Sequence, residues 1–190
     1  MDLINRIDQA EQRFCLRPQL PFFPFVDALA VELGVLQPLE HVGGQRVPQD
    51  TVVQLVWLPT IRGQIETDRK NTVRSIELLQ AAAPYELGML SGSATNSCLY
   101  PVYVRAEAYL SAQQGVAAAV EFQKNLDHRG VVRSEPIGAL AHLGLARASV
   151  LQGDTVRARA AYQDFLTLWK DADPDIPILK QAKAEYAKLQ

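Results

Sequence analysis

The sequence predicts an all-α fold built from antiparallel helix hairpins, and three observations lead to this prediction. Apolar residues such as Ala158, Tyr162 and Phe165 recur at the spacing of one helix face. Gly153 and Asp154 interrupt this helical pattern, and a glycine can end one helix where an aspartate caps the next. The pattern of small and large helix residues recurs once clearly and once more weakly at earlier positions in the chain. A hairpin of this kind leaves one apolar face uncovered, so we expect neighbouring copies to pack on it.

The internal repeat is clearest in the second helix of each expected hairpin. Each copy places a small residue four positions before a large one: Ser75 with Leu79, Ala118 with Phe122, and Ala158 with Tyr162. Successive copies are 43 and 40 residues apart. We expect the small residue to let the two helices of a hairpin approach closely, and the large residue to fill the gap to the next hairpin.

Residues 1–49 do not show the repeat and are expected to form an irregular segment packed on the first repeat. Short helices are predicted over residues 2–15 and 26–36, on either side of a stretch with three prolines that forbids a continuous helix. The three phenylalanines in residues 22–25 need burial or a partner. An exposed docking segment is therefore the alternative to a packed connector.

The repeat region is expected to span residues 50–190. Its hairpins are predicted at about 51–87, 100–128 and 137–170, and a capping helix at about 175–189. Pro59 is expected either to start a helix or to kink one. The last helix carries an apolar stripe, as the open end of a repeat array requires, and its other residues are expected to face water: Lys180, Lys183, Glu185 and Lys188.

Composition and charge exclude several classes of protein. Hydrophobic residues make up 48% and charged residues 21% of 190 residues, which is typical of a globular chain. The net charge of −2, without basic clusters, argues against a nucleic-acid partner. No run of eighteen apolar residues is present, so no membrane insertion is expected. Cys15 and Cys98 are expected to be buried thiols, and a disulfide is the alternative.

No pattern of catalytic or metal-binding residues occurs in the sequence. His41, His128 and His142 are scattered, without a second ligand at a spacing such as His-x-x-x-His. His142 is interpreted as a packing residue of a helix. Because a nucleophile elbow, a phosphate-binding loop and paired catalytic carboxylates are also missing, we expect no enzymatic activity, cofactor or metal.

The repeat resembles that of the tetratricopeptide repeat (TPR) family. The resemblance rests on the small-x-x-x-large pairs, the Leu/Ala-rich helix before them and the Gly-Asp turn. The spacings of 40 and 43 exceed the usual period of about 34, and His142 and Val102 replace the usual tryptophan. The resemblance implies a TPR-like α-solenoid, in which the first helix of each hairpin lines a concave groove that binds a peptide or protein segment.

Residues 50–190 also look like the C-terminal TPR region of large bacterial serine/threonine protein kinases. Residues 76–86, 100–105 and 165–174 carry this likeness, and residues 1–47 do not follow it well. The kinase motifs themselves are missing, so catalysis would reside elsewhere in a parent protein. The expected compartment is the cytoplasm for this chain alone, or the extracytoplasmic side if a membrane segment precedes it in a parent kinase.

The TPR resemblance also implies which side chains face the groove. They belong to the first helices of the three hairpins: Trp57, Thr60, Gln64, Tyr100, Tyr103, Glu107, Leu110, Leu140, Leu143, Arg147 and Val150. The resulting hypothesis is a peptide lying across Tyr100, Tyr103, Glu107 and Arg147, with the two charged residues selecting its charges. Packing of Tyr103 and Leu143 between hairpins is the alternative. For the whole chain, the alternative is a structural spacer or oligomerisation element, and the expected state is a monomer or weak homo-oligomer.

Overall fold

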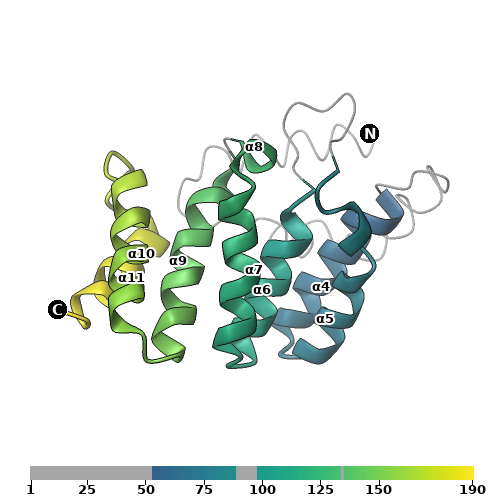
Figure 1. Cartoon of the computed structure of the whole chain (residues 1–190), viewed down its shortest axis with the longest axis horizontal. Coiled ribbons are helices and arrows are strands. Elements are labelled where there is room, and N and C mark those ends of the chain that lie inside the picture. Colours follow the sequence, from purple (N-terminus) through teal and green to yellow (C-terminus); the bar gives the residue numbers. More distant parts are fainter. Residues whose placement is uncertain (1–52, 89–97, 134) are drawn as a thin grey trace.

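The described part of the protein is a row of helices. The computed structural model describes residues 53–88, 98–133 and 135–190, and these ranges contain helices and no strand. This confirms the all-α prediction for the described residues. Figure 1 shows the helices side by side, from the first pair at one end of the row to the last helix at the other. The predictions for residues 1–49, including the docking alternative for the phenylalanines, lie outside the described residues, as does Cys15.

Three pairs of helices make up most of the row. They are α4 (Leu58–Asp68) with α5 (Thr72–Gln80), α6 (Tyr100–Ser111) with α7 (Gly115–Asp127), and α9 (Pro136–Leu151) with α10 (Thr155–Leu168). Three residues join the helices of each pair, so the two helices run antiparallel. The second helix of a pair packs on the first helix of the next, as α5 does on α6 and α7 on α9.

Shorter elements complete the described chain. A π-helical turn, η1 (Val53–Trp57), runs directly into α4, whose first turn contains Pro59. Pro59 therefore lies in the first turn of α4, directly after the π-helical turn, at the place where the helix changes from π to α geometry. A 3-10 turn, η2 (Ala83–Tyr85), follows α5, and a single turn, α8 (Arg129–Val132), precedes α9. The last helix, α11 (Pro177–Ala187), packs on α10.

The turns inside the three pairs share one backbone geometry. Lys70, Gln113 and Gly153 all have positive φ angles, of 65°, 59° and 74°. These residues are 43 and 40 positions apart, which are the spacings of the sequence repeat. In the last turn the Asp154 carboxylate accepts a hydrogen bond from the Arg157 backbone N–H at 3.0 Å and so caps α10. The repeat therefore specifies the backbone of the turn even where glycine is replaced.

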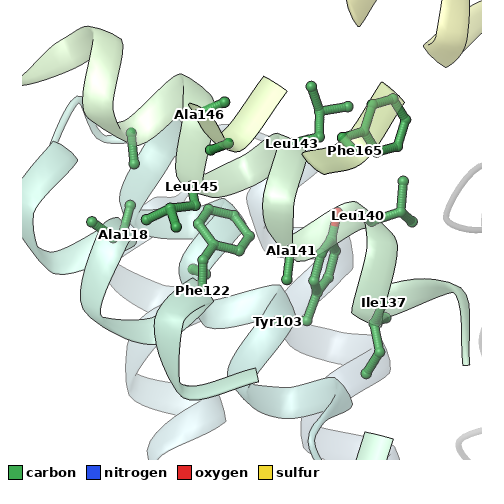
Figure 2. Packing of buried hydrophobic residues seen from close by; sticks show 14 of the residues in the cluster. Tyr103, Ala118, Phe122, Ile137, Leu140, Ala141, Leu143, Leu145, Ala146 and Phe165 are labelled. Atoms are coloured by element: carbon green, nitrogen blue, oxygen red, sulfur yellow. The ribbon is translucent and has the colours of Figure 1, made fainter. Parts of the chain in front are cut away.

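The small and large residues of the repeat form the core between the helices. Five of the six are fully buried and Tyr162 is 2% exposed. Ser75 is the polar member of the set, and its hydroxyl donates to the Gly63 carbonyl at 2.7 Å, which links α5 to α4. Figure 2 shows Phe122 among the residues of α9, where it lies against Gly144. A Cβ atom added to Gly144 would come within 2.3 Å of the Phe122 ring, so this close approach requires glycine.

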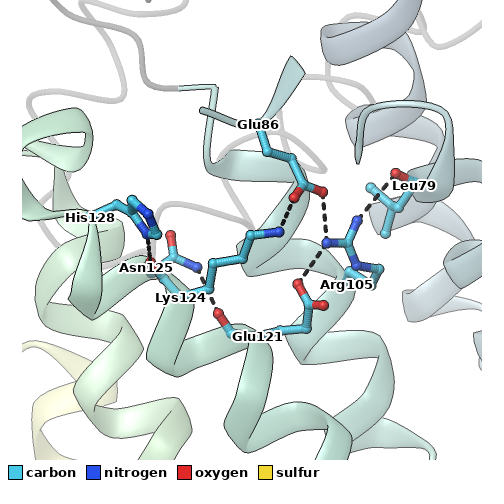
Figure 3. A network of polar contacts seen from close by, with 7 residues as sticks. All are labelled: Leu79, Glu86, Arg105, Glu121, Lys124, Asn125 and His128. Atoms are coloured by element: carbon cyan, nitrogen blue, oxygen red, sulfur yellow. Dashed lines mark hydrogen bonds and ion pairs between the residues drawn. The ribbon is translucent and has the colours of Figure 1, made fainter. Parts of the chain in front are cut away.

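A buried group of charged side chains ties the end of the first pair to the second (Figure 3). The Arg105 guanidinium of α6 lies 2.7 Å from the Glu86 carboxylate and 2.6 Å from the Glu121 carboxylate of α7. Lys124 of α7 also pairs with Glu86. Arg105 is 4% and Glu86 2% exposed, so the charges compensate one another inside the protein.

Candidate functional site

The side chains predicted to line a groove differ widely in exposure. Six of them are buried, with exposed fractions of 1% to 7%: Thr60, Gln64, Tyr100, Tyr103, Leu140 and Leu143. Four are partly buried: Trp57, Glu107, Leu110 and Arg147. Val150 is 43% exposed. A partner could therefore contact only a part of the predicted set directly.

Tyr100 connects neighbouring elements of the row. Its ring lies 6.0 Å from the Trp57 ring, measured between centroids. Its hydroxyl donates a 2.5 Å hydrogen bond to the carboxylate of Glu135, the residue before α9. Burial and the Glu135 carboxylate raise the pKa of Tyr100 above its ordinary value. Neighbouring elements already cover the Tyr100 ring, so a peptide could not lie across this ring as the hypothesis proposed.

Tyr103 and Leu143 also pack between helices. The Tyr103 ring meets the Phe122 ring edge-on, with centroids 5.6 Å apart and planes at 69°. Leu143 is 1% exposed and belongs to the same core cluster (Figure 2). Both residues therefore make the contacts expected from the alternative interpretation, in which they pack one hairpin on the next. The sequence register specifies the side of the helix on which they lie, but it does not show that an adjacent helix covers that side.

Polar side chains on successive helices form a group that we call the polar row: Gln64 and Asp68 on α4, Glu107 on α6, Arg147 on α9 and Glu185 on α11. Three of its members were predicted groove residues. Asp68 was missed because it ends its helix, and Glu185 because its spacing places it beside lysines on the water-facing side of the last helix.

Arg147 and Glu185 form a bidentate contact within the polar row. The Arg147 guanidinium donates two hydrogen bonds to the Glu185 carboxylate, at 2.9 and 3.1 Å. The Tyr162 hydroxyl donates a third at 2.9 Å. Burial alone would raise the pKa of Glu185, but Arg147 and Tyr162 outweigh it and hold the pKa below its ordinary value. The prediction that Glu185 faces water is therefore wrong, since this residue anchors α11.

The surroundings of Glu107 act on its pKa in opposite directions. Glu107 accepts a hydrogen bond from the Tyr103 hydroxyl at 3.3 Å. Burial raises its pKa, Asp68 adds to this effect, and the charge of Arg147 opposes it. On the other side of the row, the Gln64 amide N–H donates to Asp68 at 3.0 Å. The buried Gln64 amide oxygen has no hydrogen-bond partner within the described part of the chain.

A pocket of about 150 Å³ lies apart from the polar row, where α7, α8, α9 and α10 meet. The residues that line it include Asn125, Arg129, Glu135 and His142. The His142 ring lies 3.5 Å from the Asp164 carboxylate, and burial lowers its pKa. The pocket contains none of the predicted groove residues, and His142 has the partly buried position expected of a packing histidine.

Comparisons with known proteins do not identify a relative: no family model, curated protein or solved structure matches the chain. Within residues 53–88, 98–133 and 135–190, no group of three histidine, cysteine, aspartate or glutamate side chains could hold a metal ion. No helix in these ranges is long and apolar enough to cross a membrane. Cys98 is buried, as expected, and carries a free thiol whose pKa is raised by burial.

The contact between α9 and α11 leads to a prediction on stability and pH. The pKa of Glu185 in the folded protein lies below its ordinary value, so its contribution to stability is present above the ordinary pKa and is lost as the pH falls through the folded pKa. Glu185→Gln should cost about 1 kcal/mol at neutral pH, since a quarter of the side chain is exposed, and should reduce the loss of stability in acid. Urea denaturation over a pH series would measure both effects.

Lys183→Gln provides the control for this experiment, because Lys183 is an exposed residue of the same helix. It should leave the stability and its pH dependence unchanged. An unchanged acid dependence in Glu185→Gln would show that Glu185 does not hold α11 by its charge.

Proposed function

We propose that this chain is a non-catalytic, TPR-like module that binds a peptide or protein segment along the first helices of its pairs. The observation that carries this proposal is the polar row, which runs across α4, α6, α9 and α11 and so crosses the helices instead of following one of them. An extended segment lying along the row would meet a side chain from each helix in turn. Such a surface favours recognition of a chain over recognition of a small molecule.

The TPR-like arrangement is supported by the agreement between sequence repeat and structure. The left-handed turn residues Lys70, Gln113 and Gly153 recur at 43 and 40 residues, as do the buried small and large residues. Each pair thus repeats one design, and adjacent pairs bury the face that a single hairpin would leave open. Three successive pairs and a terminal helix are what an α-solenoid of this class requires.

The setting we propose is the C-terminal part of a bacterial serine/threonine protein kinase or of a relative of one. This proposal rests on the likeness of residues 76–86, 100–105 and 165–174 to such regions. It places the module in the cytoplasm, or on the extracytoplasmic side where a membrane segment precedes it. The reading frame upstream of Met1 tests the setting: a kinase domain encoded there supports it, and a frame without one contradicts it.

A structural spacer is the second candidate, and the burial of Tyr100, Tyr103 and Leu143 favours it. In a spacer these side chains would serve only to join the pairs, and Arg147 would serve only to hold α11 through Glu185. The two candidates therefore differ in whether any segment binds to the polar row.

Selection from a random peptide library, with the whole chain immobilised, distinguishes a binding module from a spacer. A binding module should enrich peptides over a heat-denatured control, and Glu107→Gln should weaken them because Glu107 lies in the polar row. Glu77→Gln is the matched control, since Glu77 lies on α5, a second helix, and is 58% exposed. Enrichment no better than that of the denatured chain, or peptides indifferent to Glu107, would favour the spacer.

A further inference from the structure

The part of the polar row between α4 and α6 is rich in hydrogen-bond acceptors. Asp68 and Glu107 contribute carboxylates from the two helices, which lie next to each other in Figure 1. The Asp68 charge also raises the pKa of Glu107. Gln64 adds an amide oxygen, and this oxygen has no partner although the residue is only 7% exposed. Nearly all buried polar atoms have a partner, so the exception needs an explanation.

The orientation of the Gln64 amide is fixed by Asp68. An ionised carboxylate only accepts hydrogen bonds, so the amide nitrogen must be the atom that faces Asp68, at 3.0 Å. The amide oxygen is bonded to the same carbon atom as that nitrogen. The unpaired acceptor is therefore the buried oxygen of the same amide group that donates to Asp68.

We call Gln64, Asp68 and Glu107 the acceptor cluster. Among the described residues, no lysine or arginine forms a hydrogen bond or salt bridge with this cluster. Asp68 forms no salt bridge within the described ranges, and the neighbouring Arg69 pairs with Glu66 at 3.0 Å. Arg147 acts on Glu107 by its charge, but its hydrogen bonds go to Glu185. Asp68, Glu107, Arg147 and Glu185 together comprise three carboxylates and one guanidinium. The polar row is thus acidic, with its excess on α4 and α6.

We propose that Gln64, Asp68 and Glu107 form a subsite for a lysine or arginine side chain of the bound segment. This inference rests on the proposed function, since it assigns a partner chemistry to the same row. Ammonium and guanidinium groups donate hydrogen bonds and accept none, which matches a cluster made only of acceptors. An acidic partner segment is disfavoured, because like charges would face each other across the interface.

The arrangement of charges also orients the segment. A basic residue placed between α4 and α6 would lie at one end of the polar row, the end that belongs to the first helix pair. Farther along the row, Arg147 and Glu185 neutralise each other, so the adjoining part of the segment can be uncharged. We therefore expect the bound segments to carry one essential basic residue, followed or preceded by neutral ones.

The test uses the peptides enriched from the random library by the whole chain. Each is synthesised with a fluorescent label in its original form and with every lysine and arginine replaced by glutamine. Fluorescence anisotropy should show a loss of affinity of about tenfold or more on this replacement. Asp68→Asn should weaken the original peptides to a similar extent but should have little effect on the glutamine forms. Glu77→Gln, on a second helix, should weaken neither.

Charge reversal gives the second arm. Glu107→Lys should weaken the original peptides, and replacing their essential basic residue by glutamate should restore binding to that variant. Far-UV circular dichroism checks that each variant is folded. If Glu107→Lys does not fold, the Asp68→Asn variant still tests the subsite, because Asp68 is exposed and its substitution should not disturb the core.

The outcomes separate this inference from the proposed function. Peptides that bind through Glu107 but are indifferent to the loss of lysine and arginine overturn the basic-residue subsite and leave the binding module standing. Peptides whose affinity does not depend on Asp68 have the same consequence. A library that yields no peptide overturns both proposals.

Discussion

Replacing Phe122 by alanine is expected to lower the free energy of unfolding by about 3–5 kcal/mol. Phe122 is fully buried, packs edge-on against Tyr103 and lies against Gly144 of α9. Removing the ring would leave a cavity between α6, α7 and α9, which the surrounding helices can fill only in part. Since domains are commonly stable by about 5–15 kcal/mol, the loss is large. Urea denaturation followed by far-UV circular dichroism would measure it.

Gly144 supplies a sharper form of the same experiment. A Cβ atom there would lie 2.3 Å from two atoms of the Phe122 ring, so Gly144→Ala should cost about 1–3 kcal/mol in the wild-type chain. In a Phe122→Ala background the ring is gone, and the same substitution should cost much less. In a double-mutant cycle, the two substitutions together should therefore cost at least about 0.5 kcal/mol less than the sum of their separate effects, because removing the ring relieves the clash. Gly130→Ala is the control, since nothing lies within 4 Å of its added Cβ atom.

Strictly additive effects of Gly144→Ala and Phe122→Ala would contradict the close approach. They would show that the ring does not occupy the space above Gly144, and that α7 and α9 pack in another register.

The helices could be predicted from the sequence because their signals are local. Two such signals are apolar residues at helical spacing and prolines in the first turn of a helix, such as Pro101 and Pro177. Both can be recognised from residues that are close together in the sequence. The shared turn geometry was only partly visible. Gly153 indicates a left-handed residue by its chemistry, but lysine and glutamine do not, so Lys70 and Gln113 become evident only when the structure shows their φ angles.

The candidate site was harder to predict because it depends on what neighbouring helices cover. The register places Tyr103 and Glu107 on one side of α6, but the Phe122 ring covers the first and leaves the second partly exposed. The contact of Arg147 with Glu185 joins residues 38 positions apart on helices that no local pattern relates. Spacing shows which side a residue takes, and only packing shows whether a partner can reach it.

The same limit applies to the buried charges around Arg105. In the sequence, Glu86 and Arg105 have no feature that distinguishes them from surface residues, and charged side chains are rarely buried without a partner. The structure buries both because Glu86 follows the first pair at the point where α6 and α7 pack against it (Figure 3). Burial opposes the charge of Arg105, but the Glu121 and Glu86 carboxylates outweigh it and raise its pKa.

Replacing Arg105 by methionine should therefore destabilise the protein by about 3–5 kcal/mol. Methionine has a similar length and fills much of the same space, so the main effect is electrostatic. Among the described residues, Glu86, 2% exposed, would keep only Lys124 as a cationic partner, and Glu121 would lose its 2.6 Å contact. Thermal and urea denaturation would measure the loss. Arg74→Met is the matched control, because its pair with Glu77 is exposed and should contribute less than about 1 kcal/mol.

A second substitution separates the charge effect from the packing effect. In the double variant Arg105→Met with Glu86→Leu, the buried carboxylate is removed together with its partner. Lys124, whose side chain is 33% exposed, can then turn its ammonium group toward water. The double variant should be more stable than Arg105→Met alone, because an uncompensated buried charge costs more than an apolar replacement of the pair. A double variant as unstable as the single one would mean that lost packing of the arginine side chain, and not the stranded Glu86 carboxylate, sets the cost.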